Sequence, residues 1–187
     1  MTGPADDLPV VLVTVGTDHH PFDRLISWCE LWAQANPERG EVVVQHGSSR
    51  APSGLTAFVR EPRAELTRQM EQAHVVVTHG GGGSITQCWQ AGVVPVVVPR
   101  EHRLGEHVDD HQEAFAGRLA EYGYVELART YQEFDAAIRT RLELPRAAGT
   151  GIDVTQPTET AIRIGGMIDE LVASRSRVRF RSNRTNV

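Results

Sequence analysis

The residues best suited to chemistry lie at 78–84, where the sequence reads T-H-G-G-G-G-S after a mainly apolar run at 74–77. Glycine lacks a side chain, so the backbone N–H groups of Gly80, Gly81, Gly82 and Gly83 can approach an anion closely. A following helix would add its positive dipole end. Ser84 and Gln87 have the S-x-x-Q spacing of a capping box, which predicts a helix starting at Ser84. The segment therefore predicts a phosphate or diphosphate site.

Other phosphate-binding motifs are excluded. The sequence has no G-x-x-x-x-G-K-[ST] and contains no lysine, which excludes a P-loop kinase or ATPase. The strict G-x-G-x-x-G of a dinucleotide site is also absent, because Ile85 and Thr86 stand where its last glycine would be. A mononucleotide or nucleotide-sugar site fits better than NAD. The alternative is that these glycines serve only the tight packing of a turn.

Histidines and cysteines offer other reactive groups. His102, His107 and His111 are spaced by five and four residues, which does not match a known metal motif, so we expect no metal ion. A site on these three histidines is the alternative. Cys29 and Cys88 stand apart in apolar helical patterns, which favours buried thiols over a disulfide or a nucleophile.

An alternation of strands and helices positions these residues. Apolar, β-branched runs predict strands at 10–15, 41–45, 56–59, 74–78, 93–99 and 124–127. Between or after them, apolar spacings of three and four predict helices that start at Pro21 and at Pro62, and helices at 84–90, 108–122, 131–142 and 158–173. The order predicts an α/β fold, a Rossmann-like parallel sheet with helices on both faces. Ligands of such sheets bind beyond the carboxyl ends of the strands.

Composition limits the class of protein. With 187 residues and 40% hydrophobic content, we expect one nucleotide-binding domain at 10–173, a disordered segment at 1–9 and a basic tail at 174–187. The tail carries five arginines in a chain of net charge −5, so it could bind an anionic surface or simply be solvated. The chain has no apolar run of the roughly 20 residues that span a bilayer and no signal-like start, so we expect a cytoplasmic protein.

Three ordered segments resemble a known family. They are V-T-V-G-T-x-x-x-P-F-D-R-L at 13–25, the glycine segment followed by A-G-V-V-P at 91–95, and the proline-ended strand that leads to His111 and Gln112. Together they resemble the C-terminal domain of family 28 glycosyltransferases, which have the GT-B fold. The chain is most similar to the stand-alone catalytic subunit of the UDP-N-acetylglucosamine transferase of the asparagine-linked-glycan pathway and to bacterial counterparts in exopolysaccharide synthesis.

The resemblance implies a UDP-sugar donor, no separate cofactor, a membrane-anchored partner subunit that binds the acceptor, and no nucleic acid. It would also place the protein at the inner face of the plasma membrane through that partner. A homo-oligomer stays open. The implied donor-binding residues are Gly80 to Ser84 for the diphosphate, Gly16 and Thr17 across the cleft, Phe58, Val59 and Arg60 at the uracil, and His111 and Gln112 at the sugar, with Glu106, Asp109 and Asp110 as further candidates.

The chemistry explains why such a site suits sugar transfer. The transition state resembles an oxocarbenium ion, while negative charge develops on the leaving diphosphate. Preorganised N–H donors stabilise that charge. We expect His19 to be the general base for the acceptor hydroxyl, unless the partner supplies it. Two alternatives to a hexosyltransferase are a non-catalytic module that binds a nucleotide or a glycan precursor, and a relative of UDP-sugar epimerases.

Overall fold

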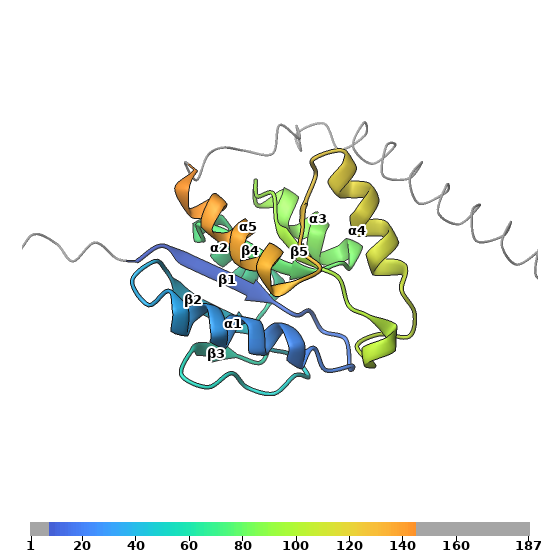
Figure 1. The fold of residues 1–187 in the computed structure, drawn as a ribbon, viewed down its shortest axis with the longest axis horizontal. Coiled ribbons are helices and arrows are strands. Elements are labelled where there is room, and N and C mark those ends of the chain that lie inside the picture. Colours follow the sequence, from blue (N-terminus) through green and yellow to red (C-terminus); the bar gives the residue numbers. More distant parts are fainter. Residues whose placement is uncertain (1–7, 145–187) are drawn as a thin grey trace, which may run out of the picture. The chain divides into compact units, whose positions relative to one another are not determined.

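The computed structural model describes residues 8–144 and shows a six-stranded parallel sheet (Figure 1). The strands are β1 (Val10–Thr14), β2 (Glu41–Gln45), β3 (Thr56–Phe58), β4 (Val75–His79), β5 (Val96–Val98) and β6 (Glu126–Leu127). The helices are α1 (Asp23–Ala35), α2 (Arg63–Gln72), α3 (Gly82–Gln90), α4 (His111–Glu121) and α5 (Tyr131–Glu143), with a 3₁₀ turn at His102–Leu104. The expected α/β architecture is confirmed.

The strand order β3-β2-β1-β4-β5-β6 places β1 beside β4 at the centre of the sheet. In the register, Thr14 pairs with Gln45 of β2 and with Thr78 of β4. The chain runs outward in one direction from β1 to β3 and in the other from β4 to β6. The loops that leave β1 and β4 therefore diverge, and such a switch point is where open parallel sheets bind ligands.

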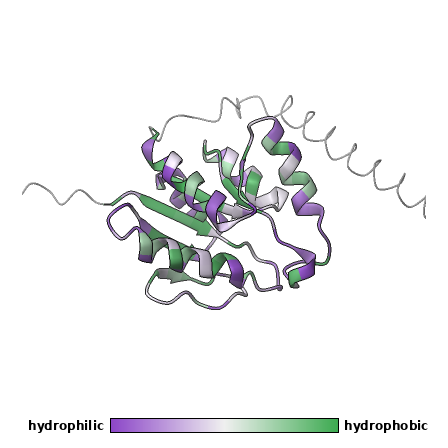
Figure 2. Ribbon diagram, viewed as in Figure 1, coloured by the Kyte–Doolittle hydropathy of each residue, from purple (hydrophilic) through white to green (hydrophobic). Residues whose placement is uncertain are grey.

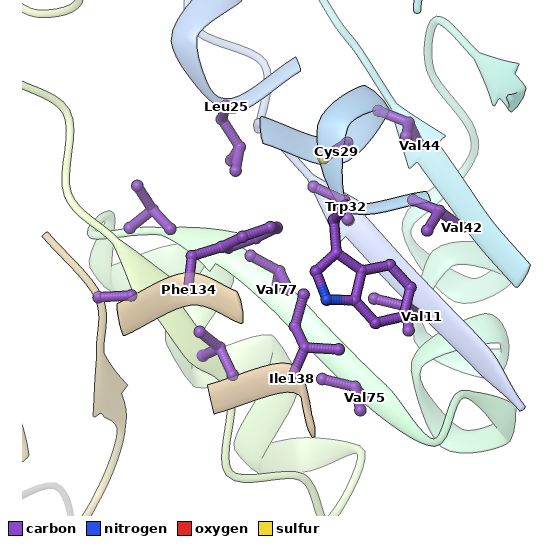
Figure 3. Packing of buried hydrophobic residues seen from close by; sticks show 14 of the residues in the cluster. Val11, Leu25, Cys29, Trp32, Val42, Val44, Val75, Val77, Phe134 and Ile138 are labelled. Carbon is purple, nitrogen blue, oxygen red and sulfur yellow. The ribbon is translucent and has the colours of Figure 1, made fainter. Parts of the chain in front are cut away.

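One face of the sheet is covered by α1 and α5. Valines at alternate strand positions point to this side, where they meet Leu25, Cys29, Trp32, Phe134 and Ile138 (Figure 3). Trp32 is fully buried, as we expected for a core residue. Burial raises the pKa of the Cys29 thiol, so this cysteine is inert.

The other face packs on α2 and α3 through Leu12, Met70, Val76 and Cys88. Figure 2 shows the result: the strands at the centre are hydrophobic, while the helices alternate between hydrophobic and hydrophilic residues along their length. Burial raises the pKa of Cys88 to about 12, and both cysteines are free. The expectation of two buried thiols is confirmed.

The main differences from the sequence-based prediction lie at the starts of two helices. α3 begins at Gly82 with Gly81 as its N-cap, so the predicted capping box at Ser84 is wrong. The Ser84 hydroxyl instead contacts the ring of His79, and the Gly81 carbonyl accepts the first helical bonds. α4 begins at His111 rather than at residue 108, because the backbone N–H of His111 bonds to the side chain of Asp109.

Parts of the predicted organisation fall outside the described residues. These are the segment 1–7, the expected helix at 158–173 and the basic tail at 174–187. Among the helices at residues 8–144, none has both the length and the apolar character that crossing a membrane requires.

Candidate functional site

A pocket of about 540 Å³ lies at the carboxyl ends of β1, β2 and β4. Eight of the residues singled out from the sequence line it: Gly16, Thr17, Arg60, Gly81, Gly83, Ser84, His111 and Gln112. Gly80, Gly82 and His19 do not line it, and neither do the further candidates Phe58, Val59, Glu106, Asp109 and Asp110. Eight of the sixteen residues named from the sequence therefore lie along the pocket.

His79, the last residue of β4, lines the pocket, although the sequence predicted no role for it. Its ring is wedged between two glycines. A Cβ atom at Gly16 would lie 2.4 Å from Nε2, and a Cβ atom at Gly81 would lie 2.2 Å from Cε1. Gly16 also has a φ of +80°, which favours glycine. The signal that could have found His79 was its place inside the glycine segment itself.

Hydrogen bonds orient the His79 ring. The Gly81 N–H donates to Nδ1 at 3.1 Å, Oε1 of Gln112 lies 3.3 Å from the same nitrogen, and Nε2 lies 3.0 Å from the Ser84 hydroxyl. Burial, helped by the charge of Arg100, lowers the pKa of His79 to about 4. The ring is therefore neutral near pH 7, and its hydrogen bond with Ser84 holds that hydroxyl at the pocket.

The start of α3 has unused backbone donors at the pocket, where Gly83 lines the wall and the exposed Gly82 precedes it. Ser84 and Ile85 donate their backbone N–H groups to the Gly81 carbonyl. Within residues 8–144, no acceptor is recorded for the N–H groups of Gly82 and Gly83. Exposed N–H groups at a helix N-terminus, beside glycines, form a ready anion site.

Gly80 has a packing role instead. A Cβ atom there would lie 2.8 Å from the Cβ of Gln112, so glycine lets α4 approach the loop closely. Gln112 is buried and lines the pocket. The packing interpretation of the glycine segment is thus correct for Gly80, while Gly82 and Gly83 remain open for a ligand.

Gln45, at the end of β2, fixes two loops of the site. Its Oε1 accepts from the Gly16 N–H at 3.1 Å and from the Thr14 hydroxyl at 2.6 Å. Its Nε2 donates to the Gly16 carbonyl at 3.0 Å and to the Val59 carbonyl at 2.9 Å. Because the side chain is buried and every polar atom is used, Gln45 holds the β1 and β3 loops in one geometry.

A buried arginine lies behind the pocket. The Arg100 guanidinium is 1% exposed and donates to the carbonyls of Val15, His20 and Glu106 at 2.7 to 2.9 Å. Glu106 is also buried and accepts two bonds from Arg24. Glu106, which we expected as a sugar ligand, therefore belongs to the scaffold that joins the β1 and β5 loops.

The proposed base lies at the rim. The His19 side chain is 84% exposed, and its Nδ1 is 3.6 Å from Asp18. His20 is more buried, and its Nδ1 lies 2.6 Å from the same Asp18 oxygen. Partial burial would raise the pKa of Asp18, but the bonds from His20 and the nearby Arg100 lower it to about 2. Asp18 is therefore ionised and orients the neighbouring histidines.

Arg60, which the resemblance placed at the uracil, is exposed, lines the pocket and donates to the Thr17 carbonyl at 3.4 Å. Its neighbour Val59 is 55% exposed. The pocket lining therefore combines glycines at a helix start with an arginine. It can hold a charged, elongated ligand such as a nucleotide.

Comparisons with known proteins agree with this geometry. The glycosyltransferase family 28 C-terminal domain model matches residues 10–148. None of the curated proteins matches the chain. Among solved structures, the glycotransferase of kitacinnamycin is 24% identical with a TM-score of 0.58, covering 92% of this chain and 41% of that one.

Two further structures share the fold. MurG of Acinetobacter baumannii is 21% identical with a TM-score of 0.54, covering 79% of this chain and 44% of that one. ALG13, solved by NMR, is 18% identical with a TM-score of 0.50, covering 74% of this chain and 87% of that one. The chain thus spans less than half of the first two structures. Since the family model matches about three quarters of the sequence, the chain belongs to the family of glycosyltransferase family 28 C-terminal domains.

Proposed function

We propose that this chain is the donor-binding part of a hexosyltransferase. It binds a UDP-sugar and, with a membrane-anchored partner subunit, transfers the sugar to a lipid-linked or polysaccharide-precursor acceptor. The observation that carries the proposal is the start of α3 at this pocket, where the N–H groups of Gly82 and Gly83 have no acceptor within residues 8–144 and His79 holds the Ser84 hydroxyl at the pocket wall.

In this proposal the diphosphate lies at the N-terminus of α3. The N–H groups of Gly82 and Gly83 and the Ser84 hydroxyl stabilise the charge that develops as the glycosidic bond to the diphosphate breaks. Thr17 and Gly16 form the opposite wall, Arg60 lies at the nucleobase, and His111 and Gln112 face the sugar. No separate cofactor is required for this step.

The general base that we propose is His19. It is exposed at the rim, where an acceptor can approach, and its Nδ1 lies 3.6 Å from the ionised Asp18 carboxylate. The base takes the proton of the acceptor hydroxyl as that oxygen attacks the anomeric carbon. His20 is the control for this assignment, because it is more buried and already bonded to Asp18.

The partner is proposed from the resemblance to a stand-alone catalytic subunit. The chain spans 41% and 44% of two of the glycosyltransferases that it resembles, but 87% of ALG13. The resemblance implies a separate subunit that binds the acceptor, and we propose such a partner here. This partner would also bring the chain to the membrane.

The test begins with calorimetry of UDP, GDP, TDP and their sugar conjugates on the full chain. We expect UDP-sugar binding that Gly83→Asp weakens and the neutral Gly83→Asn weakens much less. Transfer is then assayed with co-expressed partner candidates, where His19→Ala should lower kcat and leave donor affinity unchanged. Binding of UDP without transfer in any pairing would instead support a non-catalytic nucleotide-binding module, and no nucleotide binding would contradict the proposal.

A further inference from the structure

A cluster of imidazoles and carboxylates lies at the mouth of the pocket, where the loops after β1 and β5 meet. His107, Asp109 and His111 each offer one ligand atom, and these atoms lie within 4.8 Å of one another. The rings of His107 and His111 are nearly perpendicular, with centroids 4.7 Å apart. Two imidazoles and one carboxylate are a donor set that suits Zn²⁺ and similar ions.

The nitrogen atoms of His107 have an arrangement typical of a metal ligand. Its Nδ1 is buried, has no hydrogen-bond partner among the described residues, and lies 3.7 Å from Oδ1 of Asp109. Its Nε2 lies 3.7 Å from Oδ2 of Asp18. Metal-bound histidines commonly donate their second N–H to a carboxylate, which fixes the ring. Nδ1 of His107 thus points at the other ligands while Asp18 faces the far side of the ring.

The spacing of His107 and Asp109 also fits. Ligands on a tetrahedral Zn²⁺ with bonds of about 2.1 Å lie roughly 3.4 Å apart. Nδ1 of His107 and Oδ1 of Asp109 are 3.7 Å apart, close to that separation. Nδ1 of His111 contacts the same Asp109 oxygen more closely than two ligands of one ion would lie, so these two atoms must move apart for the ion to bind.

We propose that His107, Asp109 and His111 bind a divalent transition metal ion, with Asp18 as the outer partner of His107. Three protein ligands leave a coordination position open. His107 and His111 both line the pocket, so that position faces its interior. An ion there would place positive charge beside an anionic ligand, and this last consequence alone rests on the proposed nucleotide function.

The neighbouring histidines and carboxylates are less suitable as metal ligands. His102, which the sequence grouped with His107 and His111, directs its Nδ1 to the His107 carbonyl at 2.9 Å. In the second cluster, formed by Asp18, His19 and His20, the His19 side chain is 84% exposed and does not line the pocket, and Nδ1 of His20 is hydrogen-bonded to Asp18 at 2.6 Å. The ligand set therefore differs from the three histidines that the spacing suggested.

The test is a Co²⁺ titration of the tag-free, metal-stripped full chain, followed by visible absorption and then by competition with Zn²⁺. We expect one Co²⁺ per chain with the intense absorption of a four- or five-coordinate ion. His107→Ala, Asp109→Ala and His111→Ala should abolish this spectrum. Asp18→Asn should weaken binding about 10-fold. His19→Ala and His74→Ala should bind like wild type.

A second measurement uses only the wild-type chain, so its result does not depend on whether the variants fold. Sub-stoichiometric Co²⁺ should broaden the imidazole NMR signals of His107 and His111 first and leave those of His74 sharp. Absence of Co²⁺ binding by wild type, unchanged binding in His107→Ala, or loss of binding in His19→Ala would each overturn the assignment. Because these readouts use the metal alone, they are independent of whether UDP binds.

Discussion

The ring of His79 lies against Gly16 so closely that a methyl group at residue 16 would be 2.4 Å from Nε2. This contact joins the end of β4 to the loop after β1, the two central strands of the sheet. Gly16 therefore has two constraints, the space taken by the ring and a φ of +80°. A substitution there tests whether the contact matters beyond the backbone conformation.

We expect Gly16→Ala to lower the free energy of unfolding by about 2–4 kcal/mol, the sum of backbone strain and a steric clash. Gly54→Ala is the matched control, because Gly54 has a φ of +73° and no atom near its Cβ position. That variant should lose only about 1 kcal/mol. Urea denaturation measures the free energy of unfolding of both variants. Equal losses would show that the clash with His79 adds nothing to the backbone strain.

A charge at Gly83 separates ligand binding from stability. Gly83 is exposed near the start of α3, and a Cβ atom there meets nothing within 4 Å. A carboxylate in the first turn of a helix is stabilising, so we expect the Tm of Gly83→Asp to be unchanged or raised. The same charge should repel a diphosphate and weaken UDP binding at least about 10-fold.

Gly83→Asn is the neutral control for that change. It has nearly the same size as aspartate but no charge, so it should retain most of the affinity for UDP. Calorimetry of the two variants with UDP, together with their melting curves, separates electrostatic repulsion from obstruction. If both variants lose affinity equally, the side chain blocks the pocket and the anion site lies elsewhere.

The buried His79 predicts an acid-sensitive fold. Its pKa is about 4 when folded, against 6.5 for an ordinary histidine, so between these values the unfolded chain binds the proton and the folded chain does not. The free energy of unfolding should therefore fall as the pH drops from about 6.5 to 4, by about 2–3 kcal/mol from this residue. The low pKa of Asp18 gives stability that is fully present above pH 3.8 and is lost only as the pH falls from there toward about 2, below the range of the His79 effect.

Urea denaturation at several pH values checks this prediction. His79→Gln should lower stability at pH 7 but flatten the slope between pH 6.5 and 4. His74→Gln, at the opposite end of β4 and exposed, serves as the control and should keep the wild-type slope. An unchanged slope in His79→Gln would mean that another group causes the acid sensitivity.

Gln45→Met tests the clamp between the β1 and β3 loops. Methionine has a similar shape but cannot accept from the Thr14 hydroxyl and the Gly16 N–H or donate to the Gly16 carbonyl, which should cost about 2–4 kcal/mol of stability. The Val59 carbonyl keeps its bond from the Gly47 N–H. UDP affinity should fall as the loops loosen. Gln72→Met, on the exposed surface of α2, should change neither quantity. Retained UDP affinity in Gln45→Met would show that the loops keep their geometry without the amide.

The sequence alone was sufficient for the architecture and for eight residues of the pocket lining. Alternating valine-rich runs and helical spacings determined the parallel sheet, because these patterns reflect burial on both faces of each strand. The glycine segment at 80–83 indicated a candidate anion site, because a turn between strand and helix needs little beyond local geometry. The hydrophobic spacing and the glycine segment are both patterns within short stretches of chain, so they can be recognised in the sequence directly.

The tertiary structure decided which polar groups meet. The sequence placed a helix cap at Ser84, but folding brings the His79 ring to its hydroxyl. The resemblance offered Glu106 as a further candidate for binding the donor, but in the structure its carboxylate accepts hydrogen bonds from Arg24, 82 residues away in sequence. Gln45 and His107 likewise depend on partners from other loops. Pairings of this kind rest on how the sheet juxtaposes the ends of distant strands, and no local pattern records that arrangement.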